Sequence, residues 1–165
     1  MDFRNTKTEE FNFTIDNCLG FIANRLVKAF LKVLDYKLED YNLTGAQFCV
    51  LTKLFEEEGL TQTQLAHRLY IESPTLVRTL DKLQEAKLIV RKKVPRDRRA
   101  FNIFLTKKGK GLKNVLLEKG QEVHEIAVKD LSPEEIGLLK ELLFKLWHNL
   151  ESGALEAKHQ KEKMR

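Results

Sequence analysis

The chain has 165 residues, of which 42% are hydrophobic and 32% are charged, and its formal net charge is +5. This length suits one domain or a tightly fused pair with a proper core, and the composition excludes a low-complexity chain. No apolar run approaches the length of a membrane span, and the first residues lack the layout of a signal peptide, so we expect no membrane contact. The two cysteines, Cys18 and Cys49, lie far apart, which fits a reducing cytoplasm.

The basic excess is concentrated in one segment. Residues 61–106 hold ten Lys and Arg against four Asp and Glu, whereas the rest of the chain holds 19 against 20. A generally basic protein would spread its positive charge along the chain. A localised excess is the electrostatic pattern expected of a surface that binds nucleic acid.

The first half of the chain predicts three helices. Apolar residues recur every three or four positions from residue 13 to about residue 40, which indicates one long helix. Thr44 followed by Gln47 is a capping box and predicts the start of a second helix, which should end at residues 58–59. Thr61 with Gln64 repeats the pattern and predicts a third, short helix that ends near residue 71.

A fourth helix is predicted from Ser73, which is expected to act as N-cap with Pro74 at the first helical position. Leu76, Leu80 and Leu83 share its apolar face. The opposite, polar stripe consists of Thr75, Arg78, Thr79 and Lys82. Such donors suit the base edges of the major groove and the phosphates, so we expect Ser73, Pro74 and the polar stripe to form a DNA recognition helix. Arg78 is the expected base-reading residue.

Beyond this helix the apolar period changes to two, and residues 89–94 and 101–105 read as two strands of a β-hairpin. Its basic residues are Arg91, Lys92, Lys93, Arg96, Arg98 and Arg99, and its single acidic residue is Asp97. We expect the tip, with Arg96, Asp97, Arg98 and Arg99, to contact a minor groove, where the negative potential favours arginine. Asp97 would brace one guanidinium. The alternative is a solvated edge hairpin whose charges prevent aggregation.

Two further helices are predicted after the hairpin. Thr106 should cap a long helix that continues through Ala127, although its glycines weaken it. Ser132 and Pro133 mark the start of the last helix, which carries the cleanest apolar stripe in the chain. The tail after Gly153 is polar and is expected to fray.

These elements predict a mainly α fold with a small β-hairpin wing: a winged helix-turn-helix at residues 44–106, flanked by dimerisation helices at residues 1–43 and 107–165. The flanking helices expose more apolar surface than one small winged helix can cover, which favours a homodimer over an elongated monomeric bundle. The expected interface residues are Ile15, Leu19, Ile22, Leu139, Leu142, Leu143, Leu146 and Trp147.

Three stretches, IESPTLVRTLDKL, KLIVRK and DRRAFNIFLTKKGKG, resemble the MarR/SlyA family of dimeric transcriptional regulators. The resemblance covers roughly residues 19–150, and LVRTLD is closest to the SlyA branch. It implies a homodimer, acting as a repressor, on a pseudo-palindromic operator of double-stranded DNA. It also implies release by a small anionic or phenolic ligand, for which Arg25, Lys28 and Phe48 are the candidate residues. The alternative is that Arg25 and Lys28 form only the solvated face of an amphipathic helix.

Two specialised branches of the family suggest other sites. His124 with Glu125 could join a metal site across the dimer, as in zinc-sensing relatives, but a solvent-facing histidine is the simpler reading because no ligand cluster is visible. The reactive cysteine of the hydroperoxide-sensing branch aligns with Gly20, and its tyrosine partners align with Leu34 and Gly45. We therefore expect both cysteines to be core thiols.

No catalytic motif is present, so the sequence predicts neither an enzyme nor a cofactor or metal site. Two alternatives to a sequence-specific regulator stay open. One is an architectural DNA-binding protein without ligand control, and the other is a winged helix that binds protein. The polar stripe on the fourth helix argues against the second.

Overall fold

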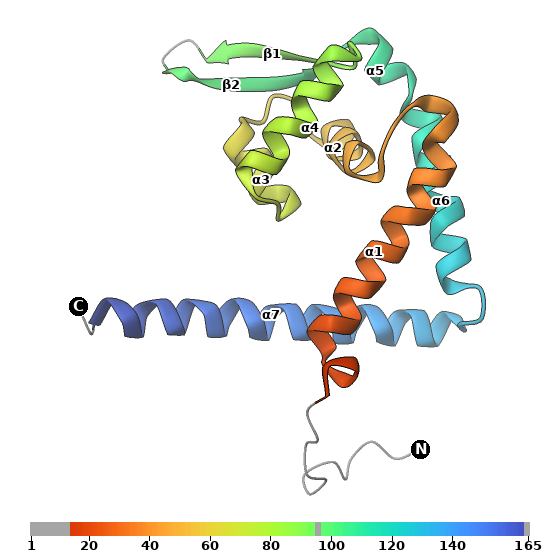
Figure 1. Ribbon diagram of the computed structural model, residues 1–165, viewed down its shortest axis with the longest axis vertical. Coiled ribbons are helices and arrows are strands. Elements are labelled where there is room, and N and C mark those ends of the chain that lie inside the picture. Colours follow the sequence, from red (N-terminus) through yellow and green to blue (C-terminus); the bar gives the residue numbers. More distant parts are fainter. Residues whose placement is uncertain (1–13, 95–96, 164–165) are drawn as a thin grey trace, which may run out of the picture. The chain divides into compact units, whose positions relative to one another are not determined.

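The computed structural model describes residues 14–94 and 97–163, with the backbone alone for residue 94 and residues 97–100. Two compact units divide the chain between Val123 and His124. The elements in chain order are η2 (Ile15–Asn17), α1 (Leu19–Leu38), η3 (Glu39–Tyr41), α2 (Gly45–Glu56), α3 (Gln62–Leu69), α4 (Ser73–Glu85), β1 (Ile89–Val94), β2 (Asp97–Leu105), α5 (Lys107–Gly111), α6 (Lys113–Val128) and α7 (Pro133–Lys163) (Figure 1). The predicted fold class, mainly α with one β-hairpin, is confirmed for the described part of the chain.

Both capping boxes predicted from the sequence are present. The backbone N–H of Gln47 donates to Thr44 Oγ1 at 3.3 Å, and the backbone N–H of Thr44 donates to Gln47 Oε1 at 2.8 Å. Thr61 and Gln64 repeat both bonds, at 3.2 Å and 2.9 Å. Each box supplies acceptors to backbone donors that the first helical turn leaves unpaired, so α2 and α3 begin where these residues stand.

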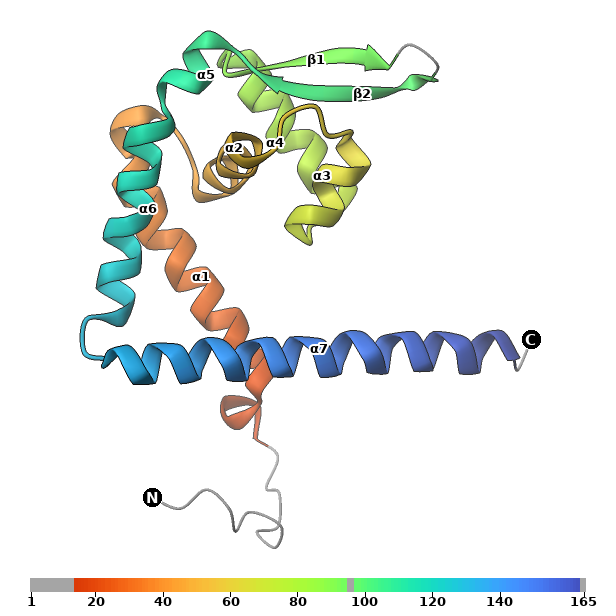
Figure 2. The same cartoon turned by 180° about the vertical axis from the view of Figure 1, so that it is seen from behind.

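One leucine-rich core holds the first unit together. Its fully buried members include Leu38 from α1, Leu51 and Leu54 from α2, Leu65 from α3, Leu76, Leu80 and Leu83 from α4, Ile89 from β1, Ile103 from β2 and Leu116 from α6. The ends of α1 and α6 therefore pack with the winged helix rather than apart from it. An ion pair between Lys37 and Glu122, 2.7 Å from Nζ to Oε2, joins the same two helices, which lie side by side in Figures 1 and 2.

The hairpin is tied to the helices along its second strand. β1 and β2 pair antiparallel with Ile89 opposite Leu105, and the register is broken by a bulge between Lys93 and Val94. On the other edge of β2, the N–H of Gly59 donates to the carbonyl of Ile103 at 2.8 Å, and the N–H of Ile103 donates to the carbonyl of Leu60 at 2.9 Å. The segment before α3 thus acts as a short third strand that fixes the base of the hairpin.

Three predicted boundaries are wrong. The first helix begins at Leu19 rather than residue 13, after a short 3-10 turn at Ile15–Asn17. The helix expected after Thr106 is interrupted at Leu112, which separates α5 from α6. The last helix continues to Lys163 instead of fraying after Gly153, because the Ala, Leu, Glu and Lys residues that follow are strong helix formers.

The second unit consists of the end of α6 and the whole of α7. The predicted restart at Ser132 is confirmed: the N–H of Glu135 donates to Ser132 Oγ at 3.2 Å, and the N–H of Ser132 donates to Glu135 Oε2 at 2.7 Å. No residue of α7 is buried in the single chain. Among the described residues, no helix combines the length and the apolar character that crossing a membrane requires.

Candidate nucleic-acid interface

The helix α4 separates an apolar face from a polar one. Leu76, Leu80 and Leu83 are buried in the core, as the sequence predicted. The exposed candidates for DNA contact are Ser73, Pro74, Thr75, Arg78 and Lys82. An exposed arginine flanked by a threonine and a lysine offers a bidentate donor for a guanine edge and further donors for phosphates.

Thr79 does not lie on this exposed face. It is only 8% exposed, and its hydroxyl donates to the carbonyl of Thr75 at 3.0 Å. The sequence pattern placed Thr79 in the polar stripe because it lies four residues after Thr75. In the helix it also lies three residues after Leu76 and four before Leu83, so it turns toward the core, and its hydroxyl is satisfied by the preceding turn. We therefore drop Thr79 from the candidate DNA contacts.

The start of α4 also differs from the prediction by one residue. Glu72 is the N-cap, with extended backbone angles, and Ser73 is the first helical residue. No side chain caps this end, and Pro74 has no N–H to be satisfied. The exposed first turn of α4 therefore presents the positive end of the helix dipole, which favours a phosphate.

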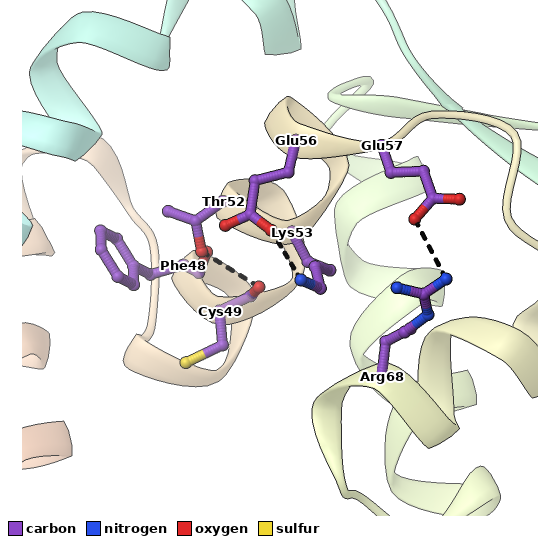
Figure 3. Close-up of polar contacts among 7 residues, drawn as sticks. All are labelled: Phe48, Cys49, Thr52, Lys53, Glu56, Glu57 and Arg68. Atoms are coloured by element: carbon purple, nitrogen blue, oxygen red, sulfur yellow. Dashed lines mark hydrogen bonds and ion pairs between the residues drawn. The ribbon is translucent and has the colours of Figure 1, made fainter. Parts of the chain in front are cut away.

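The turn before α4 is fixed by the backbone. Tyr70 ends α3 with a left-handed conformation, φ 53°, and its N–H points back to the last turn of α3. The N–H of Ile71 donates to the carbonyl of Ala66 at 3.1 Å. An ion pair at 3.5 Å between Arg68 of α3 and Glu57, just after α2, adds a link between these elements (Figure 3). These bonds set the direction in which the exposed face of α4 points.

The basic residues of β1 have two different environments. Lys92 and Lys93 are exposed, and the Lys92 ammonium lies 4.8 Å from the centre of the Phe104 ring. Arg91 instead turns toward α4, where its guanidinium lies 2.7 Å from Asp81 Oδ1, and its side chain is only 16% exposed. The sequence grouped all three as basic residues of the hairpin, since it does not show which elements lie beside each side chain.

The hairpin tip stays a prediction. Arg96 lies outside the described residues, and of Asp97, Arg98 and Arg99 only the backbone, as the start of β2, is described. The expected minor-groove contact and the bracing role of Asp97 are therefore carried forward as proposals.

The eight residues expected at a dimer interface are all exposed in the single chain. Between 40% and 63% of the surface of each is accessible: Ile15, Leu19, Ile22, Leu139, Leu142, Leu143, Leu146 and Trp147. Five of them lie on α7, which offers no buried side chain of its own. Large apolar side chains exposed together on long helices indicate surfaces that a partner covers.

The candidate ligand residues lie on two helices of the first unit. Arg25 and Lys28 are exposed on α1, and the Arg25 guanidinium lies 6.0 Å from the centre of the Phe21 ring. Phe48 lies on α2 and packs against α6, since a Cβ on Gly120 would come within 2.9 Å of its ring. The cation and the aromatic ring expected to share a ligand thus have separate neighbours.

Neither cysteine is fully buried. Burial raises the pKa of the Cys49 thiol above its ordinary value, although a backbone hydrogen bond opposes the shift. Cys49 lies on α2 beside Thr52, whose hydroxyl donates to the carbonyls of Phe48 and Cys49 (Figure 3). Cys18 is the N-cap of α1. The described residues contain no group of three or more His, Cys, Asp and Glu side chains that could hold a metal ion.

The helix pair α3 and α4, the exposed polar face of α4 and the basic hairpin beside it define a winged helix-turn-helix, a fold typical of transcriptional regulators. Residues 43–101 match the family model described as "MarR family". With the structural neighbours, this match confirms the resemblance that the sequence showed to the MarR/SlyA family of transcriptional regulators.

Three solved structures illustrate the similarity. A MarR protein from Peptoclostridium difficile DA00132 is 25% identical with a TM-score of 0.77, and the match covers 88% of this chain and 92% of that one. A MarR transcriptional regulator from Methanosarcina mazei Go1 is 26% identical with a TM-score of 0.73, over 80% of this chain and 96% of that one. A cysteine-to-serine mutant of MarR from E. coli, complexed with operator DNA, is 27% identical with a TM-score of 0.72, over 78% and 92%.

Proposed function

We propose that this protein is a homodimeric regulator that binds a pseudo-palindromic operator in double-stranded DNA, with α4 in the major groove and the hairpin at the adjacent minor groove. The observation that carries the proposal is the exposed face of α4, with Thr75, Arg78 and Lys82, beside a hairpin that holds most of the basic excess of the chain. The proposal assigns the protein no catalytic role and no cofactor.

Arg78 is the proposed base-reading residue. A guanidinium is the commonest specific partner of a guanine edge, because it donates two parallel hydrogen bonds to O6 and N7. Ser73 and Thr75, at the start of α4, and Lys82, two turns further on, are proposed to bind phosphates and so fix the register of the helix. The E. coli relative, whose structure was solved with operator DNA, supports the proposal that this protein binds an operator.

The exposed apolar residues of η2, α1 and α7 support a homodimer. A two-fold dimer would cover them and would present two α4 helices to DNA. Recognition helices about 34 Å apart meet successive turns of one face of the duplex, which requires an operator with two related half-sites. Such a dimer would act in the cytoplasm and repress a gene whose promoter overlaps the operator.

Release by a small anionic or phenolic ligand rests on the family resemblance and on the exposed cations of α1, Arg25 and Lys28. A ligand that binds the DNA-free form more tightly by about 1–3 kcal/mol would weaken the affinity for DNA roughly 5- to 150-fold. Titration of salicylate-like compounds against a preformed operator complex tests this step, with Lys28→Ala in parallel. Release that the variant lacks supports a site at Lys28. No release by any compound at millimolar levels, or equal release from both proteins, contradicts it.

The experiment for the central proposal is selection of duplexes from a random pool. We expect the captured sequences to converge on an inverted repeat with half-sites about one helical turn apart. An architectural protein would capture a broad set, enriched only in composition or flexibility. A winged helix that binds protein would capture none above background.

A further inference from the structure

The guanidinium of Arg91 connects three elements of the winged helix. Nε donates to Gln62 Oε1 of α3 at 3.1 Å, and Nη1 donates to Gln84 Oε1 of α4 at 3.3 Å. Nη2 donates to the carbonyl oxygen of Val77 at 3.4 Å and lies 2.7 Å from Asp81 Oδ1, both on α4. Arg91 itself is the third residue of β1, so one side chain joins the wing, the recognition helix and the helix before it.

These contacts leave Arg91 poorly placed to bind DNA. They use nearly all the N–H donors that a guanidinium carries. The side chain is 16% exposed, whereas that of its partner Asp81 is 52% exposed. A phosphate would have to displace the carboxylate to reach it. Lys92 and Lys93, the next two residues of the strand, are exposed and have no such set of partners on α4.

Packing alone does not fix the wing against α4 at this place. An open cavity of about 640 Å³ lies between them, and its walls include Val77, Ile89, Val90 and Phe101 together with Arg91 and Asp81. Close-packed side chains resist displacement because a shift creates voids or clashes, and an open cavity removes that resistance. The buried core holds Ile89 at the start of β1 against α4, and beyond it the directional hydrogen bonds of the guanidinium help to define the angle between β1 and α4.

The partners of Arg91 alternate along α4 with the proposed DNA contacts. Val77 and Asp81 lie one turn apart, and Arg78 and Lys82 directly follow them in the chain. A change in the rotation of α4 that loosens the Arg91 contacts therefore also moves Arg78 and Lys82. A base edge accepts bidentate hydrogen bonds only within a narrow range of angles, so specificity depends on this rotation.

We propose that Arg91 is the positioning residue of the DNA-binding surface: it sets the orientation of the recognition helix relative to the wing and does not itself contact DNA. This inference rests on the proposed function, since it explains how an operator is told from random DNA. Two alternatives make different predictions. Arg91 could be a phosphate contact, or it could stabilise the fold with no effect on DNA affinity.

The experiment compares five variants with the parent: Arg91→Met, Arg91→Lys, Asp81→Asn, Lys93→Met and the double variant Asp81→Asn with Arg91→Met. Fluorescence anisotropy gives Kd for a selected operator and for random duplex over a range of salt concentrations, at a temperature where thermal unfolding shows every variant to be folded. Lys93→Met is the matched control, because it removes one exposed positive charge from the same strand.

Arg91→Met is expected to weaken operator binding about tenfold, the size of a lost hydrogen bond to a charged group, and random binding less. The salt dependence should stay as in the parent, because no phosphate contact is lost. Arg91→Lys should fail to restore affinity, since a lysine keeps the charge but cannot form the planar fork. Asp81→Asn should also weaken operator binding, although it removes a negative charge near the DNA. The double variant, Asp81→Asn with Arg91→Met, should bind the operator no more weakly than either single variant, because both substitutions break the same contact.

Several results would overturn the inference. A salt slope that falls by about one unit in Arg91→Met, with rescue by Arg91→Lys, would make Arg91 a phosphate contact. Tighter binding by Asp81→Asn would mean that this acid acts on DNA only through its charge. Unchanged operator affinity in folded Arg91→Met would leave a purely structural role. If the parent prefers the operator and the variants have the same two Kd values as the parent, this inference alone is refuted. If the parent binds neither duplex, the proposed function is refuted as well.

Discussion

Gly109 lies so close to Leu88 that a Cβ at this position would come within 2.2 Å of the Leu88 carbonyl oxygen. The glycine lies in α5, and Leu88 directly precedes β1, so the contact joins the start of the wing to the helix that follows it. Gly109→Ala must displace backbone rather than a flexible side chain. We expect a loss of about 2 kcal/mol in the free energy of unfolding, in the range of overpacking substitutions. Urea unfolding measures it.

Gly111→Ala is the matched control, because nothing lies within 4 Å of the Cβ that it would add. Alanine costs less than glycine in a helix, so this variant should be as stable as the parent or more stable by up to about 1 kcal/mol. Equal effects of the two substitutions would show that Leu88 yields without cost and that α5 does not constrain the wing.

The wing prediction concerns Arg98 and Arg99. Replacing both with alanine should weaken binding to all duplexes and reduce the slope of log K against log salt by about two units or less, because each lost phosphate contact accounts for about 0.9 unit. Binding titrations of operator and random DNA at several salt concentrations measure the slope. A slope equal to that of the parent would show that the hairpin tip does not contact DNA.

The dimer prediction concerns α7. Deletion from Leu131 onward removes the five expected interface residues of α7, among them Leu143 and Trp147, and should yield a monomer with weakened operator affinity. Sedimentation measures the mass. Leu143→Glu with Leu146→Glu is a milder variant that keeps the helix and should act the same way, since both charges would be buried without partners. A deleted protein that remains dimeric and keeps its operator affinity removes the case for dimerisation through the terminal helix.

The cysteine prediction concerns reactivity. Burial disfavours the charged thiolate of Cys49 and raises its pKa, so its reaction with an alkylating reagent should reach half of its limiting rate at a higher pH than that of an ordinary free thiol. The rate is measured against pH in a Cys18→Ser variant, so that only Cys49 reacts. A midpoint below that of a free thiol would indicate an activated cysteine and would reopen the redox reading that the sequence disfavoured.

The local signals in the sequence were sufficient to find the winged helix. Thr44 with Gln47 and Thr61 with Gln64 mark helix starts through bonds made within four residues, so no tertiary information is needed. The change of apolar period after Leu88 located the hairpin for the same reason. The split of the chain proposed from the sequence, with helices 1–43 and 107–165 set apart from residues 44–106, stays a prediction about dimerisation. The compact units divide instead between Val123 and His124.

Features that depend on contacts between elements were not predictable. Thr79 belongs to the polar stripe by residue type, yet it lies on the side of α4 that faces the core and is buried there. Arg91 reads as one more basic residue of the wing, and only the positions of Gln62, Asp81 and Gln84 make it a bridge. The start of α1 at Leu19 was missed because an apolar stripe reports the face of a helix more reliably than its end.

Operator reading by Arg78 is tested by the ratio of Kd for random duplex to Kd for the selected operator, measured at one salt concentration in the parent, Arg78→Ala and Thr79→Ala. We expect a parent ratio of about 10³ or more. Arg78→Ala should lose about 1–3 kcal/mol of binding free energy on the operator, with relaxed specificity at one position of each half-site. Thr79→Ala should keep the parent ratio, because this hydroxyl is buried and bonded to Thr75. A parent that binds both duplexes equally, or an Arg78→Ala variant that discriminates as well as the parent, would contradict the claim that α4 reads an operator through Arg78.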